Sequence, residues 1–259
     1  MSKTQLQKKT TKFSIPKIGE DEEQNKDSVN YSDEFNRFAL SDGVSGSSYS
    51  KEWADLLTKG FIEKPFMKEN FDLKSWITPL QITWYNAIPW ETLEDPTKHP
   101  HYVAEKAREG GSATFVGGYF EEIDQKIFLK TWALGDSNLF LVREGQNILS
   151  FPLTTSEEFG IDPDMFFSLP KDIENSTETR TYVGEIKYKE IEILENDLII
   201  CASDSISKWY IDSLDNPTIL PWMELEQIFS IDDFKNFISD KVKCKNLKND
   251  DSSIIVMRF

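Results

Sequence analysis

Residues 36–61 read NRFALSDGVSGSSYSKEWADLLTKGF and predict a strand, a turn and a helix in succession. The apolar run ends at Asp42, and Gly43 breaks the strand where the chain must turn. Serines that can cap a helix follow, and four apolar residues then recur at helical spacing: Trp53, Leu56, Leu57 and Phe61. Asp42 therefore stands at the end of a buried strand, where its charge costs solvation free energy unless a cation or hydrogen bonds compensate it.

The same arrangement recurs in three other phrases, TWALGDSN, LIICASDS and NDDSSIIVMRF, with Asp136, Asp204 and Asp250. Any one of these residues is more simply a turn former or a helix cap. Four of them at distant strand ends predict that the fold gathers them into one site for a hard cation. Carboxylates suit Mg²⁺ and Mn²⁺, whereas a zinc site would recruit more His or Cys than His99 and His101 in a loop provide.

The whole-chain composition narrows the function class. The 259 residues carry a net charge of -16, which disfavours binding to nucleic acid but permits a phosphorylated substrate if metal ions supply positive charge. No apolar run approaches the roughly 20 residues needed to span a bilayer, and MSKTQLQKKTTKF lacks the apolar centre of a signal peptide. The chain has two cysteines, Cys201, which we expect in the core, and Cys244. So few cysteines fit a cytoplasmic protein, although two residues could still form one disulfide.

The order of the predicted elements indicates an α+β fold. We expect strands at 12–15, 28–31, 36–42, 112–121, 126–135, 138–144, 147–151, 181–193, 197–203 and 253–258. Helices are expected within 45–61, in pieces over 73–109 interrupted by Pro79, Pro89, Pro96 and Pro100, and at 205–214, 221–229 and 231–242. Short consecutive strands favour antiparallel sheets, with the helices outside them. No repeat or linker divides the chain, which predicts a single domain over residues 1–259.

Six phrases, in order over most of the chain, resemble the metal-dependent type 2C serine/threonine protein phosphatases, especially the bacterial branch. The phrases are NKDSV, FALSDGVSGSSYSKEWA, GGSAT, ALGDSNLFLVR, LIICASDS and DDSSIIVMRF. None is specific alone, and their order and spacing carry the resemblance. It implies a four-layer α-β-β-α sandwich of two mainly antiparallel sheets flanked by helices.

The resemblance also implies roles for individual residues. Asp42 corresponds to the carboxylate that bridges two Mg²⁺ or Mn²⁺ ions, and Gly43 to the residue whose backbone carbonyl binds one of them. Asp204 and Asp250 match the other carboxylate ligands of this binuclear centre. Asp136 matches a residue that helps to hold a third, weaker ion.

A catalytic role is implied for Asp42 and for Asp27, which matches a buried acidic residue outside the ligand set. Such residues orient ligands and metal-bound water. Two divalent ions about 3.5–4 Å apart can make a bridging hydroxide available, which attacks phosphorus without a Ser or Cys nucleophile. The implied activity is hydrolysis of phosphoserine or phosphothreonine in a protein substrate, with a cognate kinase as a further partner.

Three positions depart from the pattern of the resembled proteins. Glu22 stands where many of them have an Arg that grips phosphate, so phosphate must be bound by metals, by another cation, or weakly. Val44 stands where eukaryotic members have a His, and Ser205 replaces a Gly after Asp204.

Two alternatives to a phosphoprotein phosphatase stay open. One is a catalytically weak or inactive regulatory or binding module of the same fold, supported mainly by Glu22. The other is a phosphohydrolase acting on a small molecule. Residues 152–180, expected to be irregular, correspond to a flap that helps to choose the substrate; the simpler interpretation is a surface loop over packed aromatic side chains, Phe159, Phe166 and Phe167.

Overall fold

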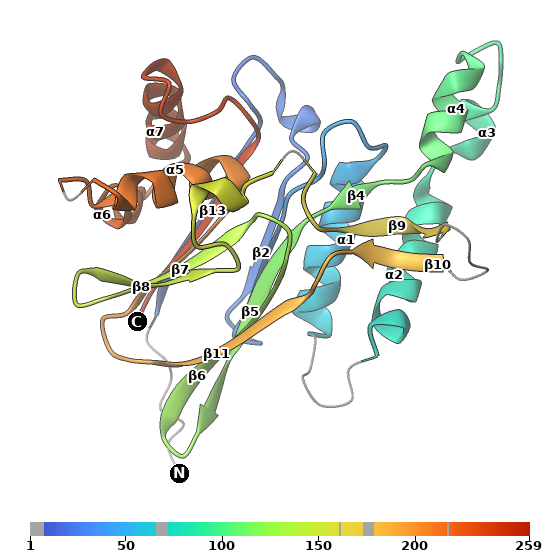
Figure 1. The fold of residues 1–259 in the computed structure, drawn as a ribbon. Helices are drawn as coiled ribbons and strands as arrows, with labels where there is room; N and C mark the ends of the chain where they lie inside the picture. The colour runs from blue at the N-terminus through green and yellow to red at the C-terminus, as the bar shows by residue number, and fades with distance from the viewer. Residues whose placement is uncertain (1–7, 66–71, 161, 173–178, 217) are drawn as a thin grey trace.

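Two five-stranded sheets, in which all neighbouring strands are antiparallel, form the centre of the computed structural model, which describes residues 8–65, 72–160, 162–172, 179–216 and 218–259 (Figure 1). The first sheet has the order β1 (Lys9–Ile15), β13 (Ser252–Arg258), β12 (Leu198–Ala202), β7 (Asn138–Arg143) and β8 (Gln146–Phe151). The second has the order β11 (Lys187–Ile193), β6 (Lys126–Leu134), β5 (Phe115–Ile123), β3 (Arg37–Ser41) and β2 (Ser28–Ser32).

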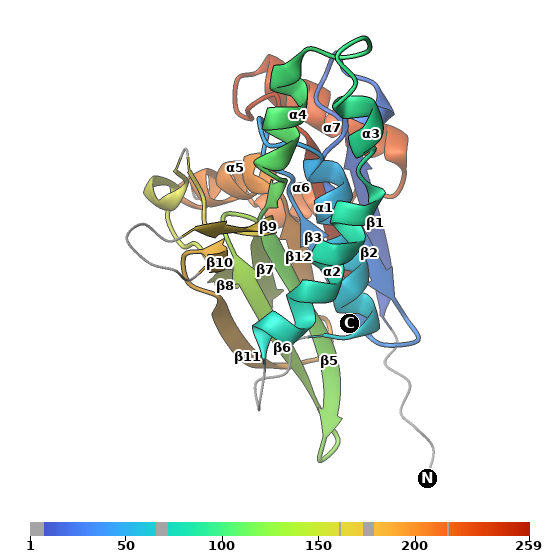
Figure 2. The same ribbon diagram turned by 90° about the vertical axis from the view of Figure 1, so that its right-hand side faces the viewer.

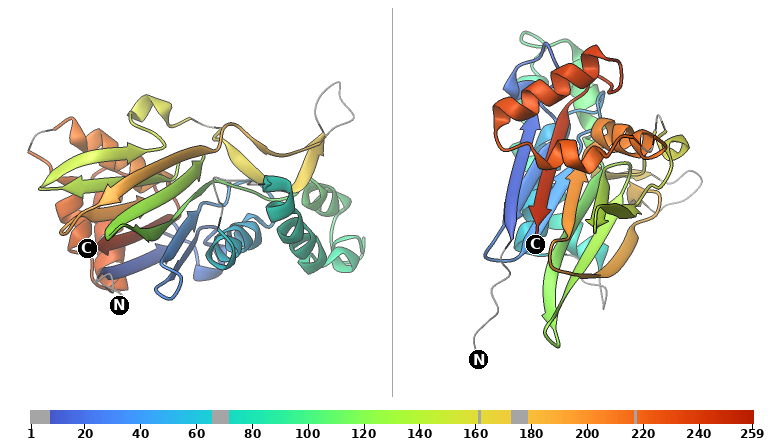
Figure 3. Two further views of the ribbon diagram at one scale, coloured as in Figure 1. Left: turned by 90° about the horizontal axis from the view of Figure 1, so that it is seen from below. Right: turned by 90° about the vertical axis from the view of Figure 1, so that its left-hand side faces the viewer.

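Helices cover the outer face of each sheet, as the view from below in Figure 3 shows. Over the first sheet lie α5 (Asp204–Leu214), α6 (Pro221–Glu226) and α7 (Ile231–Lys243). Beside the second lie α1 (Ser50–Glu63) and α2 (Leu73–Ala87), followed by α3 (Trp90–Leu93) and α4 (His101–Arg108) (Figure 2). The predicted four-layer α-β-β-α arrangement is therefore confirmed.

The alternation of apolar side chains along the strands explains why the sheets have two buried faces. In β13, Ile255 and Met257 pack between the two sheets, whereas Ile254 and Val256 pack against α5 and its neighbours. Successive side chains of a strand point to opposite faces, so an unbroken apolar run such as SIIVM is buried on both sides.

The described parts of residues 152–180, which leave out 161 and 173–178, are more ordered than the sequence predicted. They contain a short 3-10 helix, Ser156–Glu158, and the strand β9 (Met165–Asp172), which pairs with β4 (Ser112–Ala113) and with β10 (Thr179–Val183). Phe166 is fully buried and Phe167 nearly so, whereas Phe159 is partly buried. The interpretation of packed aromatic side chains was therefore right for Phe166 and Phe167.

Two local predictions in the helical region were wrong. Pro79 lies inside α2 and does not interrupt it, whereas Pro89 and Pro100 stand at helix starts. The residue that precedes α1 is not serine but Tyr49, with a left-handed φ of 54°. The nearby Ser47 hydroxyl instead joins the loop to β4, because it accepts a hydrogen bond from the Ser112 N–H at 3.0 Å.

Both cysteines are free: Cys201 is buried between the sheets, as predicted, and Cys244 is exposed. Among the described helices, none combines the length and the apolar character needed to cross a bilayer.

Trp53 links α1 to the small sheet formed by β4, β9 and β10. Its indole is fully buried, and its N–H donates to the Phe166 carbonyl at 3.1 Å. Trp53→Phe should therefore lower the free energy of unfolding by about 2 kcal/mol or more, because it removes buried volume and a buried hydrogen bond. Urea denaturation followed by circular dichroism measures the change.

Trp90→Phe is the matched control. The Trp90 indole is only half-buried and donates to the Tyr85 carbonyl at 2.9 Å. We expect a loss below about 1 kcal/mol there, since water can replace the lost bond. Equal losses for the two variants would contradict a structural role for the Trp53 link.

Candidate metal centre

Each acidic residue singled out in the sequence lies at the end of a strand. Asp27 directly precedes β2, Asp42 directly follows β3, Asp136 lies in the turn between β6 and β7, Asp204 begins α5 just after β12, and Asp250 precedes β13. Sequence reasoning therefore placed all five correctly relative to the strands.

The strand register brings two of these residues to the same edge of the first sheet. Strands β12 and β13 are antiparallel neighbours, with Ala202 opposite Ile254. Asp204 and Asp250 lie just beyond this pair, one after β12 and the other before β13. The ladder continues to the bond from the Ser203 N–H to the Ser253 carbonyl, at 3.0 Å, so this end of the sheet is firmly held.

The pairing of adjacent strands also places the other three acidic residues. Strand β7 also pairs with β12, so the turn that carries Asp136 lies at the same end of the first sheet. In the second sheet, Ser28 of β2 lies opposite Ser41 of β3. Their neighbours Asp27 and Asp42 therefore lie side by side at the end of that ladder.

The two groups of carboxylates lie close enough for the charge of one to shift the pKa of the other. Burial raises the pKa of Asp42 well above its ordinary value of 3.8, and four negative charges raise it further: Asp27, Asp204, Asp136 and Asp250. Burial and the charge of Asp250 also raise the pKa of Asp204, and a hydrogen bond from Asp42 offsets part of that shift. Carboxyl groups gathered in this way occupy a position where a bound cation would offset their repulsion.

Asp27 and Asp136 are the most enclosed of the five residues, with 2% and 8% of their surface exposed. Burial raises the pKa of Asp136 to about 7 and that of Asp27 to about 8. The Ser253 and Ser203 hydroxyls lower the pKa of Asp27 in part, but neither meets the geometry of a hydrogen bond to it, and both of its carboxylate oxygens lack a partner. Orphaned buried oxygens call for a cation or an ordered water.

The backbone at Gly43 is held from both sides. Gly43 forms a bridge with Ala113, and the Thr114 N–H donates to the Asp42 carbonyl at 2.9 Å. A Cβ at residue 43 would lie 2.6 Å from the Lys26 carbonyl oxygen. Only glycine allows this close approach between the loop after β3 and the segment that precedes Asp27.

Sequence reasoning missed Asp251, the second residue of the doubled acid in NDDSS. Asp251 is 5% exposed and accepts hydrogen bonds from two backbone N–H groups, Lys17 at 3.0 Å and Lys26 at 2.9 Å. It therefore ties the start of β13 to the loop that carries Asp27. Two consecutive aspartates could have predicted this role, because their side chains point in different directions and only one of them can face the site.

Lys248 was also missed, because nothing in its spacing marks it. Its ammonium forms an ion pair with Asp250. This bond, together with the charges of Asp250, Asp204 and Asp42, raises the pKa of Lys248. A cation of the protein itself therefore lies among the carboxylates.

The three departures noted in the sequence have separate structural settings. Glu22 is exposed and lies 3.4 Å from the Lys235 ammonium on α7. Ser205 is buried, and its N–H donates to the Asp204 carboxylate at 2.5 Å. The N–H of Val44 donates to the Ser112 carbonyl at 2.9 Å, which makes it part of the loop anchor.

The donor set fits a hard divalent cation. It consists of carboxylate oxygens that repel one another, and a bound cation would offset both that repulsion and the desolvation of Asp27. Within the described ranges, however, no three or more His, Cys, Asp or Glu side chains already stand as the ligands of a metal ion. Binding would therefore require the carboxylates to turn toward a common centre and Lys248 to release Asp250.

The raised pKa values predict how stability depends on pH in the absence of metal. Folded Asp136 and Asp27 keep a proton up to about pH 7 and about pH 8, whereas in the unfolded chain they lose it near 3.8. Between these values the folded state binds more protons, so the free energy of unfolding falls as pH rises, by about 1.4 kcal/mol per pH unit for each group. Urea denaturation in EDTA from about pH 5 to about pH 9 measures this slope.

Asp136→Asn tests the assignment of the slope. It removes one of the buried groups whose pKa is raised, so stability should vary less with pH in this variant. Adding Mn²⁺ should raise the stability of the unsubstituted protein most at high pH, where the carboxylates are ionised. A slope that is flat, or unchanged by the substitution, would contradict the burial of these groups as ionisable carboxyls.

Among the comparisons with known proteins, only the search of solved structures gives matches. No protein-family model and no curated protein sequence matches the chain. Solved structures do match over 97% of it: the serine/threonine phosphatase PstP/Ppp of Mycobacterium tuberculosis (TM-score 0.56, 15% identity, 98% of that chain) and the photosystem II phosphatase PBCP (0.58, 16%, 98%). The catalytic domain of PstP in complex with two manganese ions also matches (0.53, 16%, 97% of each chain). The chain therefore has the fold of the type 2C serine/threonine phosphatases.

Proposed function

We propose that the chain is a serine/threonine phosphoprotein phosphatase that depends on Mg²⁺ or Mn²⁺. The observation that carries this proposal is the meeting of five carboxylates, from separate segments of both sheets, at one place in the fold. The likeness to phosphatase structures supports it, and the PstP catalytic domain has two manganese ions in its crystal structure. The substrate would be a protein phosphorylated by a cognate kinase. The free cysteines support work in a reducing cytoplasm.

In this proposal the metal ligands come from three strand ends and one turn. Asp42 would bridge two ions and the carbonyl of Gly43 would bind one of them, with Asp204 and Asp250 completing the pair. Asp136 would help to hold a third, weaker ion. When bound, such ions lower the pKa of a water molecule and neutralise charge on phosphoryl oxygens.

The chain's own residues prepare the site in two further ways. Asp27, with both oxygens unpartnered and its pKa raised to about 8, can hold a proton at neutral pH and orient a water molecule by hydrogen bonding. Asp251 does not face the ions in this scheme. Its bonds to the backbone of Lys17 and Lys26 fix the position of its neighbour Asp250 and of the loop before Asp27.

One second candidate has a specific observation in its favour. A regulatory or binding module of the same fold, with weak or no activity, is supported by the ion pair between Lys248 and Asp250, because the lysine already neutralises a proposed ligand. The exposed, Lys235-bound Glu22 supports it too, since no arginine stands at that position. Such a module would bind a phosphoprotein without releasing phosphate.

Turnover of p-nitrophenyl phosphate and of a phosphoserine peptide separates the two candidates. We expect hydrolysis that requires Mn²⁺ or Mg²⁺ and falls more than about 100-fold in Asp42→Asn, because the bridging carboxylate would be lost. Asp240→Asn is the matched control: it removes the same charge from a side chain that is 77% exposed on α7, and it should retain activity.

Three outcomes are decisive. Metal-dependent turnover abolished by Asp42→Asn alone supports the phosphatase. Phosphopeptide binding without turnover, in protein shown to be folded, favours the binding module. Turnover of small phosphate esters with none of phosphopeptides would replace both with a small-molecule phosphohydrolase.

A further inference from the structure

A cavity of about 580 Å³ opens directly beside the candidate metal centre, with Asp136 and Asp204 in its wall. It lies between α5, the segment 242–249 that ends and follows α7, and residues 159–160 of the segment expected to act as a flap. Three lysines also line it: Lys208, Lys245 and Lys248. A groove that leads away from the reacting centre is where the rest of a macromolecular substrate would lie.

The charge of this wall differs from that of the chain as a whole. The net charge of -16 repels acidic ligands at long range, whereas the wall of this cavity balances its three lysines against three aspartates, Asp136, Asp204 and Asp212, and is neutral overall. The Lys208 ammonium forms an ion pair with the Asp212 carboxylate at 3.7 Å, and the Lys248 ammonium forms one with Asp250. Lys245 forms no ion pair with any residue in the described part of the chain.

Helix stabilisation does not account for Lys245. Basic residues in the last turn of a helix favour its dipole, and α7 already has Lys241 and Lys243 there. Those two lysines pair with Glu224 at 2.6 Å and with Asp240 at 3.7 Å. Lys245 lies beyond the end of α7.

The backbone at Lys245 has the conformation that glycine normally supplies. Its φ is 59°, its N–H donates to the Val242 carbonyl, and the Asn246 N–H donates to the Lys241 carbonyl, each at 3.0 Å. This bond pattern is the Schellman motif, whose left-handed residue is usually glycine because a side chain there is disfavoured. A lysine at this position costs stability and leaves its ammonium without an ion-pair partner in the described chain, which points to a function outside the fold.

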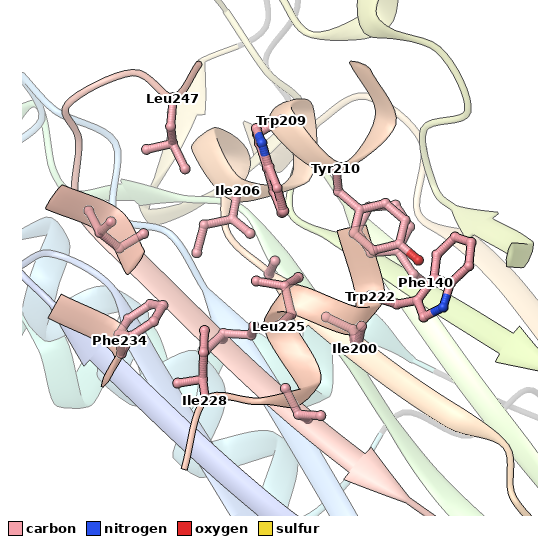
Figure 4. Close-up of a cluster of buried hydrophobic side chains, with 14 of the residues drawn as sticks. Phe140, Ile200, Ile206, Trp209, Tyr210, Trp222, Leu225, Ile228, Phe234 and Leu247 are labelled. Carbon is pink, nitrogen blue, oxygen red and sulfur yellow. The ribbon is translucent and has the colours of Figure 1, made fainter. Parts of the chain in front are cut away.

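The segment that carries the lysines is fixed to the core. Leu247, 5% exposed, packs into the same cluster as Ile206 and Trp209 of α5 (Figure 4). Trp209 is 4% exposed and also lines the cavity. Lys245 and Lys248 flank this anchored leucine, so their backbone positions relative to Asp204 are set by packing.

We propose that this cavity is the substrate groove and that Lys245, with Lys208, selects phosphorylated segments with acidic side chains next to the phosphorylated residue. The inference rests on the proposed phosphatase function for the position of the phosphoryl group at the carboxylate cluster. Exposed lysine–carboxylate contacts contribute up to about 1 kcal/mol, so each lysine should contribute a preference of up to about fivefold.

The test compares two phosphoserine peptides that differ only in having glutamates or glutamines beside the phosphoserine. We expect a higher kcat/KM for the acidic peptide with Mn²⁺, and a preference that weakens as ionic strength rises. Anisotropy of the fluorescein-labelled peptides with metal-free protein should show the same order of affinity. This second measurement does not require turnover.

Lys245→Gly is the decisive variant. It removes the ammonium but suits the left-handed backbone, so the melting temperature should equal or exceed that of the unsubstituted protein while the acidic preference falls by up to about fivefold. Lys243→Gln, two residues away and outside the cavity wall, removes the same charge and should leave the preference unchanged.

The outcomes separate this inference from the proposed function. Turnover without any preference for the acidic peptide would contradict the proposed substrate groove and leave the proposed phosphatase function standing. A preference that Lys243→Gln reduces as much as Lys245→Gly would have the same meaning. Absence of turnover with any phosphate ester would contradict the proposed phosphatase function. In that case the affinities measured by anisotropy still show whether the groove prefers the acidic peptide. A preference lost only in Lys245→Gly supports it.

Discussion

Repulsion among Asp27, Asp42, Asp136, Asp204 and Asp250 is the constraint on which the rest of this structure depends. Each carboxylate is partly or fully removed from water, and Asp27, Asp136, Asp204 and Asp250 all raise the pKa of Asp42. Such a cluster is unfavourable unless protons or cations neutralise it. The fold nevertheless holds it in place, because each residue is attached to the end of a strand whose register is fixed by long ladders.

The supporting residues hold the backbone around the site, and the charge of Asp251 also raises the pKa of Asp27. Gly43 permits the loop after β3 to touch the Lys26 carbonyl, and Asp251 binds the Lys26 N–H from the other side. The two sheets are thus joined at the site itself as well as through the apolar layer between them. A small displacement of one sheet relative to the other would change several distances between the carboxylates at once. The site would then lose the geometry needed to bind a cation as a whole, and not one ligand at a time.

Much of the fold and the site could be predicted from the sequence because the deciding signals are local. The apolar run before Asp42, the glycine after it and the run after Asp251 each mark a strand and its end. Strand β9 was missed because Pro163 and Pro170 suggested a loop, yet Pro170 falls where the pairing with β10 shifts register between Arg180 and Tyr182. The cavity beside α5 depends on contacts between distant segments, which local patterns do not record. The ion pair between Lys248 and Asp250 is local, but no regular spacing marks it in the sequence.

The position of β13 has a consequence for synthesis of the protein. Residues 252–258 form an inner strand, between β1 and β12, although β1 begins at residue 9. A nascent chain therefore holds β1 and β12 without the strand that joins them until residues 252–258 have left the ribosome. Until then the first sheet stays divided, with unpaired strand edges, and Asp250 cannot join the other carboxylates, so a chaperone that shields strand edges would protect the chain at this stage.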